Sequence, residues 1–389
     1  MSDYIVKNAL FAREDANGDI VANPKVLQIC VNEFGVKQDT TYTDKECLLK
    51  DGVTEVEGET KVTGGFKYPL ESNTIGFTLT HLLGDASGAV DATVATWGSD
   101  TVMAIGDKVN TSDGKWTLTV KRVSGDAKTG GIEPTVTSYG ETISDNNVVW
   151  SAIPKERVLV YPYSSIVPKF TAELTLEDGD GNTWIKQYRH LELDKFPITI
   201  NGNGDYEVSV DTIGGVAVDE TSPLWGKDLL SNTGAMLVKA EESFLGGSCE
   251  LTNVLIDDIA KALDSIELTI DKGLTEQPTV SCKKRISRKL SIKGKASLLF
   301  TPADYENFKN REAFDFKATI SSREGTSILW HFPKCKPKFT EPNIKTHTEV
   351  TLDPDFTVNV KDDATPICTA TATIPSLVNG ADGSIIGDW

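Results

Sequence analysis

One arrangement of segments occurs twice along this chain, and it constrains the fold more than any other feature. In each copy an alternating, strand-like segment leads into a short apolar segment of helical character, and two strand-like segments joined by a glycine-containing turn follow. The copies span residues 60–215 and 285–360, with first strands at 61–70 and 288–300, helical segments at 75–83 and 302–308, and strand pairs at 170–188 and 314–332. Because the copies share order rather than residue identity, and no catalytic motif accompanies them, the repeat predicts a building block for a symmetric assembly.

The charge balance limits the partners of the protein. The chain has 389 residues, enough for two or three domains, and its formal net charge is −18 because 57 acidic residues outnumber 39 basic ones. Contacts with phosphates require clustered Lys and Arg, so this balance argues against direct binding of a nucleic-acid backbone. An acidic surface either serves solubility alone or lines a channel through which DNA slides without adhering.

No catalytic or metal-binding motif is recognisable in the sequence. It contains no HExxH, GxSxG, Walker or GxGxxG pattern, its four histidines lie far apart, and DGDGN at 178–182 lacks the downstream glutamate and flanking helices of a calcium loop. Six cysteines occur without a CxxC pair, which predicts reduced and mostly buried thiols: Cys30, Cys47, Cys249, Cys282, Cys335 and Cys368. We therefore expect no catalytic residue, no metal site and no cofactor.

A membrane-spanning or targeting segment is not recognisable either. No stretch of the sequence is long and apolar enough to cross a bilayer, and the amino-terminal residues lack the apolar core of a signal peptide. We expect a protein that is made and kept in the cytoplasm until it is assembled, with no membrane partner.

The segments that flank the repeated pattern have different predicted roles. Residues 1–25 are polar and predict a terminal arm, whereas residues 33–59 contain the hairpin signal Asp51-Gly52 and predict a projecting ribbon. Residues 216–250 are irregular and predict a linker between the copies. The apolar spacing at 253–264 predicts a short helix.

Residues 86–154 interrupt the first copy with a segment rich in Gly, Asp, Thr and Val. Its aromatic residues have two interpretations, because tryptophan and tyrosine faces stack on sugar rings and also supply the core of so small a module. Both interpretations apply to the candidate glycan-binding residues Trp97, Trp116, Tyr139 and Trp150.

The one basic concentration in this acidic chain lies at residues 283–295. Its alternation places Ile286, Leu290 and Ile292 nearly on one strand face, so the charges are expected to point outward. Such a strand is either a solvated sheet edge protected by Lys and Arg, or a docking surface for an acidic patch on a neighbouring copy. With the ribbon, it supplies the candidate contacts between stacked rings: Asp44, Lys45, Asp51, Glu55, Lys283, Arg285 and Arg288.

The inserted segment resembles a known module. It contains, in order, Trp97, GDKV at 106–109, Glu133-Pro134 and DNNVVW at 145–150. This order and spacing are similar to a small β module of phage tail and fibre proteins, which is related in appearance to chitin-type carbohydrate-binding modules. The resemblance implies a cell-surface glycan as a partner of the module.

The rest of the chain resembles a phage tail tube protein in the duplicated form of that family. The resemblance is carried by the strand at 26–31, by GGFKYPL at 64–70 leading into GFTLTHLL at 76–83, and by the paired strands, with the second copy repeating the pattern at 288–300 and 314–332. It implies a mainly β fold: two tandem tail-tube domains, each a β-sandwich or barrel-like sheet with a flanking short helix, plus the small inserted β domain. The expected boundaries are 1–85 with 155–215 for the first domain, 86–154 for the insertion, 216–250 for the linker and 251–389 for the second domain.

The same resemblance implies a structural role in the tail of a bacteriophage. Three chains would form a ring of pseudo-six-fold symmetry, or six chains a hexamer, and rings would stack into a hollow tube that conducts DNA during ejection. The expected partners are further copies of the chain and other tail proteins, such as the tape measure, the terminator and the baseplate or sheath. DNA would pass through an acidic lumen without specific binding. The expected location is the virion tail, with assembly in the host cytoplasm.

Two other functions remain open on the sequence alone. A fibre or baseplate adhesin would bind host glycan through the aromatic module and use the β units as a scaffold. An acidic secreted glycoside-active enzyme is disfavoured because neither a signal peptide nor an acid–base pair is recognisable.

Overall fold

The computed structural model describes residues 5–29, 31–46, 53–91, 93–137, 141–178, 180–201, 207–219, 221, 226–239, 250–261, 263–278, 283–287, 290–299, 301–321, 326–338, 351–378, 385–387 and 389. Within these residues the chain is mainly β with two α-helices, which confirms the predicted fold class. Neither helix has the length and apolar composition that crossing a membrane requires.

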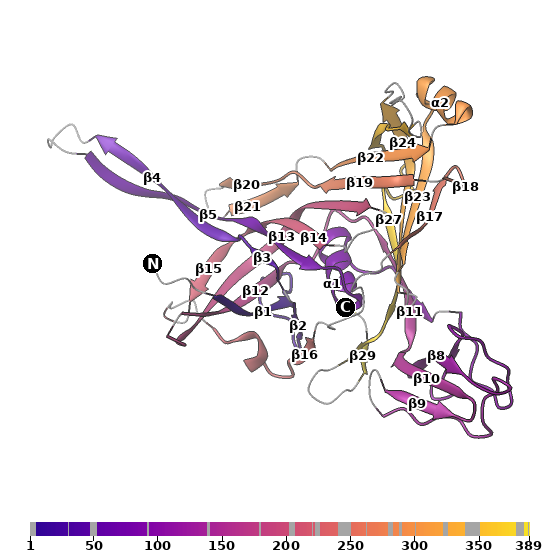
Figure 1. Ribbon diagram of the computed structural model, residues 1–389. Coiled ribbons are helices and arrows are strands. Elements are labelled where there is room, and N and C mark those ends of the chain that lie inside the picture. Colours follow the sequence, from indigo (N-terminus) through magenta and orange to yellow (C-terminus); the bar gives the residue numbers. More distant parts are fainter. Residues whose placement is uncertain are drawn as a thin grey trace.

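Six antiparallel strands build the first unit (Figure 1). The pairing runs from β1 through β12, β13, β14 and β5 to β4. These strands are β1 Ile5–Arg13, β4 Lys37–Glu46, β5 Val53–Pro69, β12 Phe170–Glu177, β13 Thr183–Asn201 and β14 Glu207–Gly214. Helix α1 (Ser72–Leu83) follows β5, and the short strand β3 (Glu33–Phe34) pairs with β5 along the same edge as β4.

A second series of six strands repeats this order. The pairing runs from β17 through β23, β24, β26 and β22 to β19, and every neighbour is again antiparallel. The strands are β17 Glu250–Ile256, β19 Leu263–Asp271, β22 Ser291–Leu299, β23 Phe314–Ser321, β24 Ser327–Lys338 and β26 Asp355–Val358. Helix α2 (Pro302–Lys309) follows β22, as α1 follows β5.

Irregularities in the pairing recur at matching positions in the two units. The first strand of each series contains a register shift, between Val6 and Asn8 in β1 and between Leu251 and Asn253 in β17. The hairpins shift as well, between Phe170 and Ala172 in β12 and between Phe314 and Phe316 in β23. Bulges bend a strand locally and depend on detailed geometry, so their recurrence indicates that the two units share one backbone plan.

The two helices differ in how deeply they are buried. Helix α1 is apolar, and Ile75, Phe77 and Leu79 are at most 1% exposed because strands of both units enclose the helix. Helix α2 begins at a cap in which the Thr301 hydroxyl accepts a hydrogen bond from the Asp304 amide (3.1 Å), and it buries little besides Phe308. The burial of α1 therefore reflects contact with the second unit.

Aromatic side chains fill the core of each unit. Phe11, Phe66, Phe77 and Phe170 pack with ring centroids 5.1–6.4 Å apart in the first unit. Phe314, Phe316 and Phe356 form the corresponding group in the second. The two groups belong to one continuous core.

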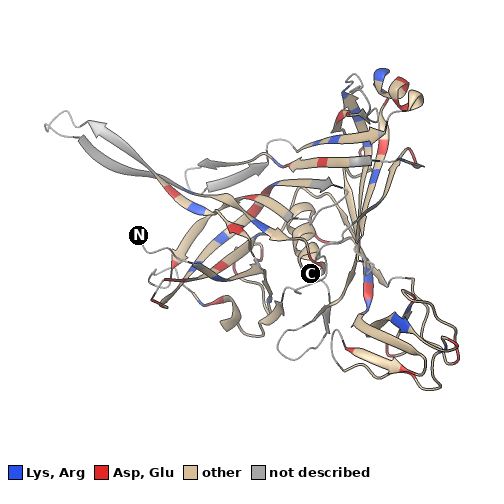
Figure 2. Ribbon diagram, viewed as in Figure 1, with Lys and Arg blue, Asp and Glu red and all other residues tan. Residues whose placement is uncertain are grey.

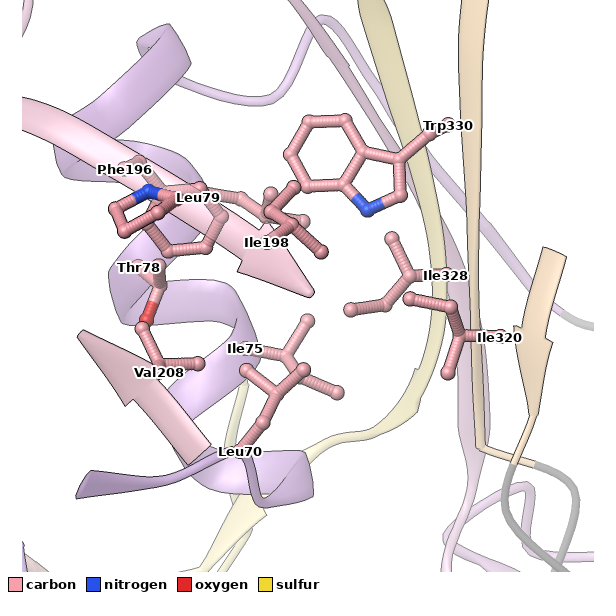
Figure 3. Close-up of a pocket in the computed structure, with 11 residues that line it drawn as sticks. Leu70, Ile75, Thr78, Leu79, Phe196, Ile198, Val208, Ile320, Ile328 and Trp330 are labelled. Carbon is pink, nitrogen blue, oxygen red and sulfur yellow. The ribbon is translucent and has the colours of Figure 1, made fainter. Parts of the chain in front are cut away.

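A small cavity of about 20 Å³ remains where the two units meet. Its lining comes from β5, α1, β13 and β14 of the first unit and from β23 and β24 of the second, and it is apolar apart from Thr78 (Figure 3). The side chains that converge there include Ile75, Phe196, Ile328 and Trp330. The cavity lies at a seam between units and holds no converging polar groups, so we do not interpret it as a ligand site.

Shorter elements complete the body. They are β2 Lys25–Gln28, β6 Ala89–Asp91, β11 Glu156–Pro162, β18 Ile259–Ala260, β20 Leu274–Pro278, β21 Lys283–Ser287, β25 Thr351–Leu352, β27 Thr369–Pro375, β28 Leu377–Val378 and β29 Ile385–Gly387. Strand β27 pairs with both β24 and β11. Near the carboxyl terminus, the Trp389 indole N–H donates to the carbonyl of Asn73, and Gly76 leaves room in α1 for this ring.

The insertion forms a separate four-stranded sheet beside β11 (Figure 1). Its order is β7–β8–β10–β9, with β7 Lys108–Asn110, β8 Trp116–Val123, β9 Thr142–Asp145 and β10 Val148–Pro154. It has its own core, in which Trp116, Leu118, Val148 and Trp150 are buried together.

Three sequence predictions are wrong. Residues 5–13 form β1, a central strand, rather than an arm, because Ala9 and Phe11 pack into the main core and Leu10 into a second cluster on the other face. The segment 216–250 is not only a linker, since β15 (Val216–Asp219) pairs with β13, β16 (Met236–Lys239) pairs in parallel with β2, and a short 3₁₀ turn, η1 (Leu229–Ser231), buries Leu229.

The third wrong prediction is the helix at 253–264. The segment is instead the hairpin of β17 and β18. Asp257 and Asp258 have φ angles of 52° and 62°, which a two-residue hairpin turn requires and a helix excludes.

Candidate functional site

The two units are joined by a β ladder between strands of different units. The last seven residues of β13, Lys195 to Asn201, pair antiparallel with Asp271 to Ser265 of β19. Through this ladder the strands β4, β5, β14, β13, β19, β22, β26 and β24 form one continuous sheet. We call the β13–β19 ladder the internal joint.

Lys272 fastens the internal joint to helix α1. Its backbone N–H donates to the Asp194 carbonyl (2.9 Å), and its ammonium group donates to the carbonyl of His81 (3.2 Å) in the last turn of the helix. A cation is favourable there because helix C-terminal carbonyls carry partial negative charge. Two residues after Lys272, the Leu274 amide donates to the Asp194 carboxylate (2.7 Å).

Burial changes the titration of these groups. Lys272 is 3% exposed, and burial lowers its pKa from the usual 10.5 to about 8, although Glu192 and Asp194 offset part of the effect. Burial also lowers the pKa of His81 to about 3, so that this ring stays neutral, and raises the pKa of Cys368 to about 12. The internal joint therefore contains a buried ammonium group whose charged form is destabilised by burial.

One edge of the sheet repeats the geometry of the internal joint without its partner. In the second unit, Ile266 pairs with Ala296 and Thr269 with Lys293; in the first, Phe34 pairs with Phe66 and Lys37 with Thr63. Matching the two hairpins places residues 33–39 where residues 265–271 lie in the second unit.

Residues 265–271 are paired on both sides, by β22 and by β13. Among the described residues, 33–39 form a ladder with β5 alone. The nearby strand β15 contributes a bond from the Ala217 amide to the Gln38 side chain (3.0 Å), which is not a ladder. We call residues 33–39 the open edge.

The residues predicted to make contacts between rings fall on two hairpins. Strands β4 and β5 pair Asp44 with Glu55, next to Lys45, and β20 and β21 pair Glu276 with Arg285, near Lys283. In Figure 1 the hairpin of β4 and β5 extends to the left of the body, whereas β20 and β21 lie above the strands of the first unit. The side chains of these residues are not described, and Asp51 and Arg288 lie outside the described residues. The contacts therefore remain predictions.

The aromatic residues of the insertion do not form an exposed platform. Trp116 and Trp150 are 7% and 0% exposed and pack in the core of the module, so their role as glycan-stacking faces is wrong. Trp97 is partly buried against the same core. Tyr139 lies outside the described residues.

Asp145 organises the insertion, and the sequence interpretation missed it. One carboxylate oxygen accepts hydrogen bonds from the indole N–H groups of Trp97 and Trp150 (both 3.2 Å), and the other accepts one from the Gly130 amide (2.6 Å). The carboxylate is 6% exposed, so these donors replace its hydration. Its position in the DNNVVW motif was visible in the sequence, and Trp150 belongs to the same motif, but Trp97 and Gly130 come from other segments.

A second buried carboxylate, Glu14, lies between strands of the first unit. The Glu14 carboxylate accepts hydrogen bonds from the Thr171 hydroxyl (2.6 Å) and the His190 amide (2.7 Å), and it contacts the His190 ring at 2.8 Å. These contacts supply hydrogen-bond partners to a carboxylate that is buried between strands. In the described part of the chain, no group of three His, Cys, Asp or Glu side chains could hold a metal ion.

No protein-family model matches this chain, and no curated protein matches it either.

Replacing Asp145 by Asn should destabilise the insertion by about 2–3 kcal/mol, because an amide presents N–H groups to donors that now face a carboxylate oxygen. Urea unfolding followed by tryptophan fluorescence measures the change. Asp100→Asn is the matched control, since Asp100 is exposed and asparagine accepts its φ of 53°. Equal unfolding midpoints for the two variants would contradict the assigned role of Asp145.

The buried ammonium group predicts a rise in stability with pH. Because the folded-state pKa of Lys272 is about 8 and the unfolded one 10.5, the unfolded chain binds more protons between these values, and unfolding becomes harder as the pH rises. The gain over this window should be ~3 kcal/mol relative to Lys272→Met, which cannot titrate. Urea unfolding of both proteins from pH 7.5 to pH 10.5 gives the difference. A difference that does not vary with pH would show that Lys272 titrates normally.

Proposed function

We propose that this chain is a structural tail tube protein of a tailed bacteriophage, whose rings stack into a hollow tube that conducts DNA. The observation that carries the proposal is the pair formed by the internal joint and the open edge. The ladder that is complete at the internal joint has, as far as the described residues go, no second strand at the open edge, and a neighbouring chain can supply one.

The internal joint is a head-to-tail contact, because β13 and β19 occupy different positions in their units. A head-to-tail contact that repeats from chain to chain closes into a ring or continues as a helix. Closure removes all open edges, which otherwise invite uncontrolled pairing. With two units per chain, three chains give a ring of pseudo-six-fold symmetry, and a ring of six chains is the alternative.

The layering of the chain supports an assignment of the channel face. Helix α1 and the strands around β1 and β12 cover one face of the continuous sheet (Figure 1). On the other face, which we call the uncovered face, the described side chains are exposed or partly exposed. In a closed barrel the covering layers have room only outside, so the uncovered face would line the channel.

The charges on that face differ from the expected acidic lining. The strand register places lysines and carboxylates together on this face. The lysines are Lys37, Lys61, Lys67, Lys195, Lys293, Lys295, Lys336 and Lys338, and the carboxylates are Glu33, Asp39, Asp211, Glu267, Asp271 and Asp355. Both signs are interspersed in Figure 2. On the face that the proposal assigns to the channel, the described residues are therefore of mixed charge rather than acidic.

The proposal also assigns roles to the two hairpins and to the insertion. The ribbon of β4 and β5 and the hairpin of β20 and β21 would bridge stacked rings. The insertion, which adjoins β11 on the covered side, would stand on the outside of the tube. Tape measure, terminator and baseplate or sheath proteins would be the tail partners, and the virion tail the location.

The alternative of a glycan-binding adhesin loses its main support. It required exposed aromatic faces in the insertion, but two of the four candidates are core residues and the indole N–H of Trp97 is bound to Asp145.

The open edge can be tested with proline, which removes a backbone N–H from a ladder. Successive N–H groups of a strand point to opposite edges, so one of Lys37→Pro and Gln38→Pro removes an outward-facing N–H. Electron microscopy of the purified wild-type protein should show stacked rings or hollow tubes. The variant that loses the outward group should remain monomeric, with an unfolding free energy within about 1–2 kcal/mol of wild type.

Lys37→Thr is the matched control, because it keeps the N–H and introduces the residue found at the equivalent position 269. It should assemble as the wild type does. Assembly that survives both proline substitutions, or isolated wild-type trimers that retain glycans, would refute the proposed function.

A further inference from the structure

A cleft on the uncovered face of the second unit gathers most of that face's positive charge. It has a volume of about 690 Å³ and lies over β19, β22, β24 and β26. Five cations line it, Lys293, Lys295, Lys336, Lys338 and Arg311, together with the two carboxylates of Glu267 and Asp355. We call this hollow the basic cleft.

The strand register sets the spacing of its lysines. Lys293 and Lys336 both lie beside Thr357, and Lys295 and Lys338 both lie beside Asp355, because β26 runs between β22 and β24. Two residues along a strand span about 7 Å, and two strand spacings about 10 Å. The four lysines therefore occupy the corners of a rectangle of roughly these dimensions on the sheet.

Within the described part of the chain, no carboxylate forms an ion pair with the cations of the basic cleft. Several ion pairs form elsewhere on the surface. Glu267 and Asp355 alternate with Lys295 and Lys338 along one row of the sheet, whereas Lys293 and Lys336 have only threonines between and beside them. The second row is the less compensated one.

The first unit does not repeat this arrangement. The pairing of Asp211 with Gly65 corresponds to that of Asp355 with Lys295, so Gly65 and Thr63 occupy the positions of Lys295 and Lys293. The shared backbone plan therefore does not require Lys293 and Lys295, and these two lysines have no counterpart in the first unit.

We propose that the basic cleft binds the phosphodiester backbone of double-stranded DNA. This inference rests on the proposed function, because the tube would bring DNA to the uncovered face. Lysines without partners attract phosphates by displacing condensed counterions, without reading base sequence. The remainder of the chain is strongly acidic and opposes the contact, so binding is weak, salt-sensitive and compatible with movement of the DNA. Net charge alone concealed this local cluster.

The test compares two double variants of the full chain. Fluorescence anisotropy of a labelled duplex of about 20 base pairs is followed from about 20 to 200 mM salt. Lys293→Gln with Lys336→Gln should weaken binding and reduce the slope of log affinity against log salt by about two. The control, Lys121→Gln with Arg122→Gln, removes the same charge from exposed positions in the insertion and should leave the slope unchanged.

Three results would overturn the assignment: no binding by wild type at the lowest salt, equal slopes for both double variants, or displacement of the duplex by polyglutamate as effectively as by unlabelled DNA. The last result would mean that the cleft recognises acidic protein surfaces. Electron microscopy of the cleft variant separates this inference from the proposed function, because rings and tubes should still form when DNA binding is lost.

Discussion

An open β-sheet edge presents unpaired N–H and C=O groups, and the whole structure is organised around how such edges are satisfied. Inside the chain, the end of β13 pairs with β19 and merges the two units into one sheet. At the far end, the corresponding edge at residues 33–39 forms a ladder with β5 alone among the described residues. Because β13 and β19 already form this ladder within the chain, neighbouring chains can pair through the open edge with the same type of β ladder.

The internal joint also explains features that look unrelated. Helix α1 is buried on nearly all sides because it is enclosed by strands of both units, whereas α2 remains largely exposed. Lys272 is buried at the joint and bonds to the end of α1, which ties the helix to the second unit. Burying an ammonium group is destabilising by itself, so its retention fits a role in fixing the relative position of the units.

Local patterns in the sequence were sufficient for the fold class and for the order of strand, helix and hairpin in each unit. They failed where burial depends on distant segments. Residues 9–12 are all buried because β1 lies between two apolar layers, so the alternation typical of a half-buried strand is missing. The apolar residues at 254–260 have helical spacing, but the pairing of β17 with β23 overrides it.

The candidate site was less accessible to prediction from sequence. The internal joint depends on pairing between residues about 70 positions apart, for which no local pattern exists. Of the basic cleft, Lys293 and Lys295 belong to the basic stretch recognised at residues 283–295, but Lys336 and Lys338 come from β24 and meet them only in the folded sheet. For the tryptophans of the insertion the sequence left two interpretations open, a glycan platform or the core of the module, and the structure places Trp116 and Trp150 in the core.

Hydrogen exchange at the open edge tests the central claim most directly. In the unassembled chain, the amides of residues 265–271 should be protected on both sides of the strand, and outward-facing amides of residues 33–39 should exchange rapidly. On assembly, the amides of residues 33–39 should become as protected as those of residues 265–271. An assembled particle in which residues 33–39 exchange as fast as in the free chain would contradict the claim that neighbouring chains pair through this edge.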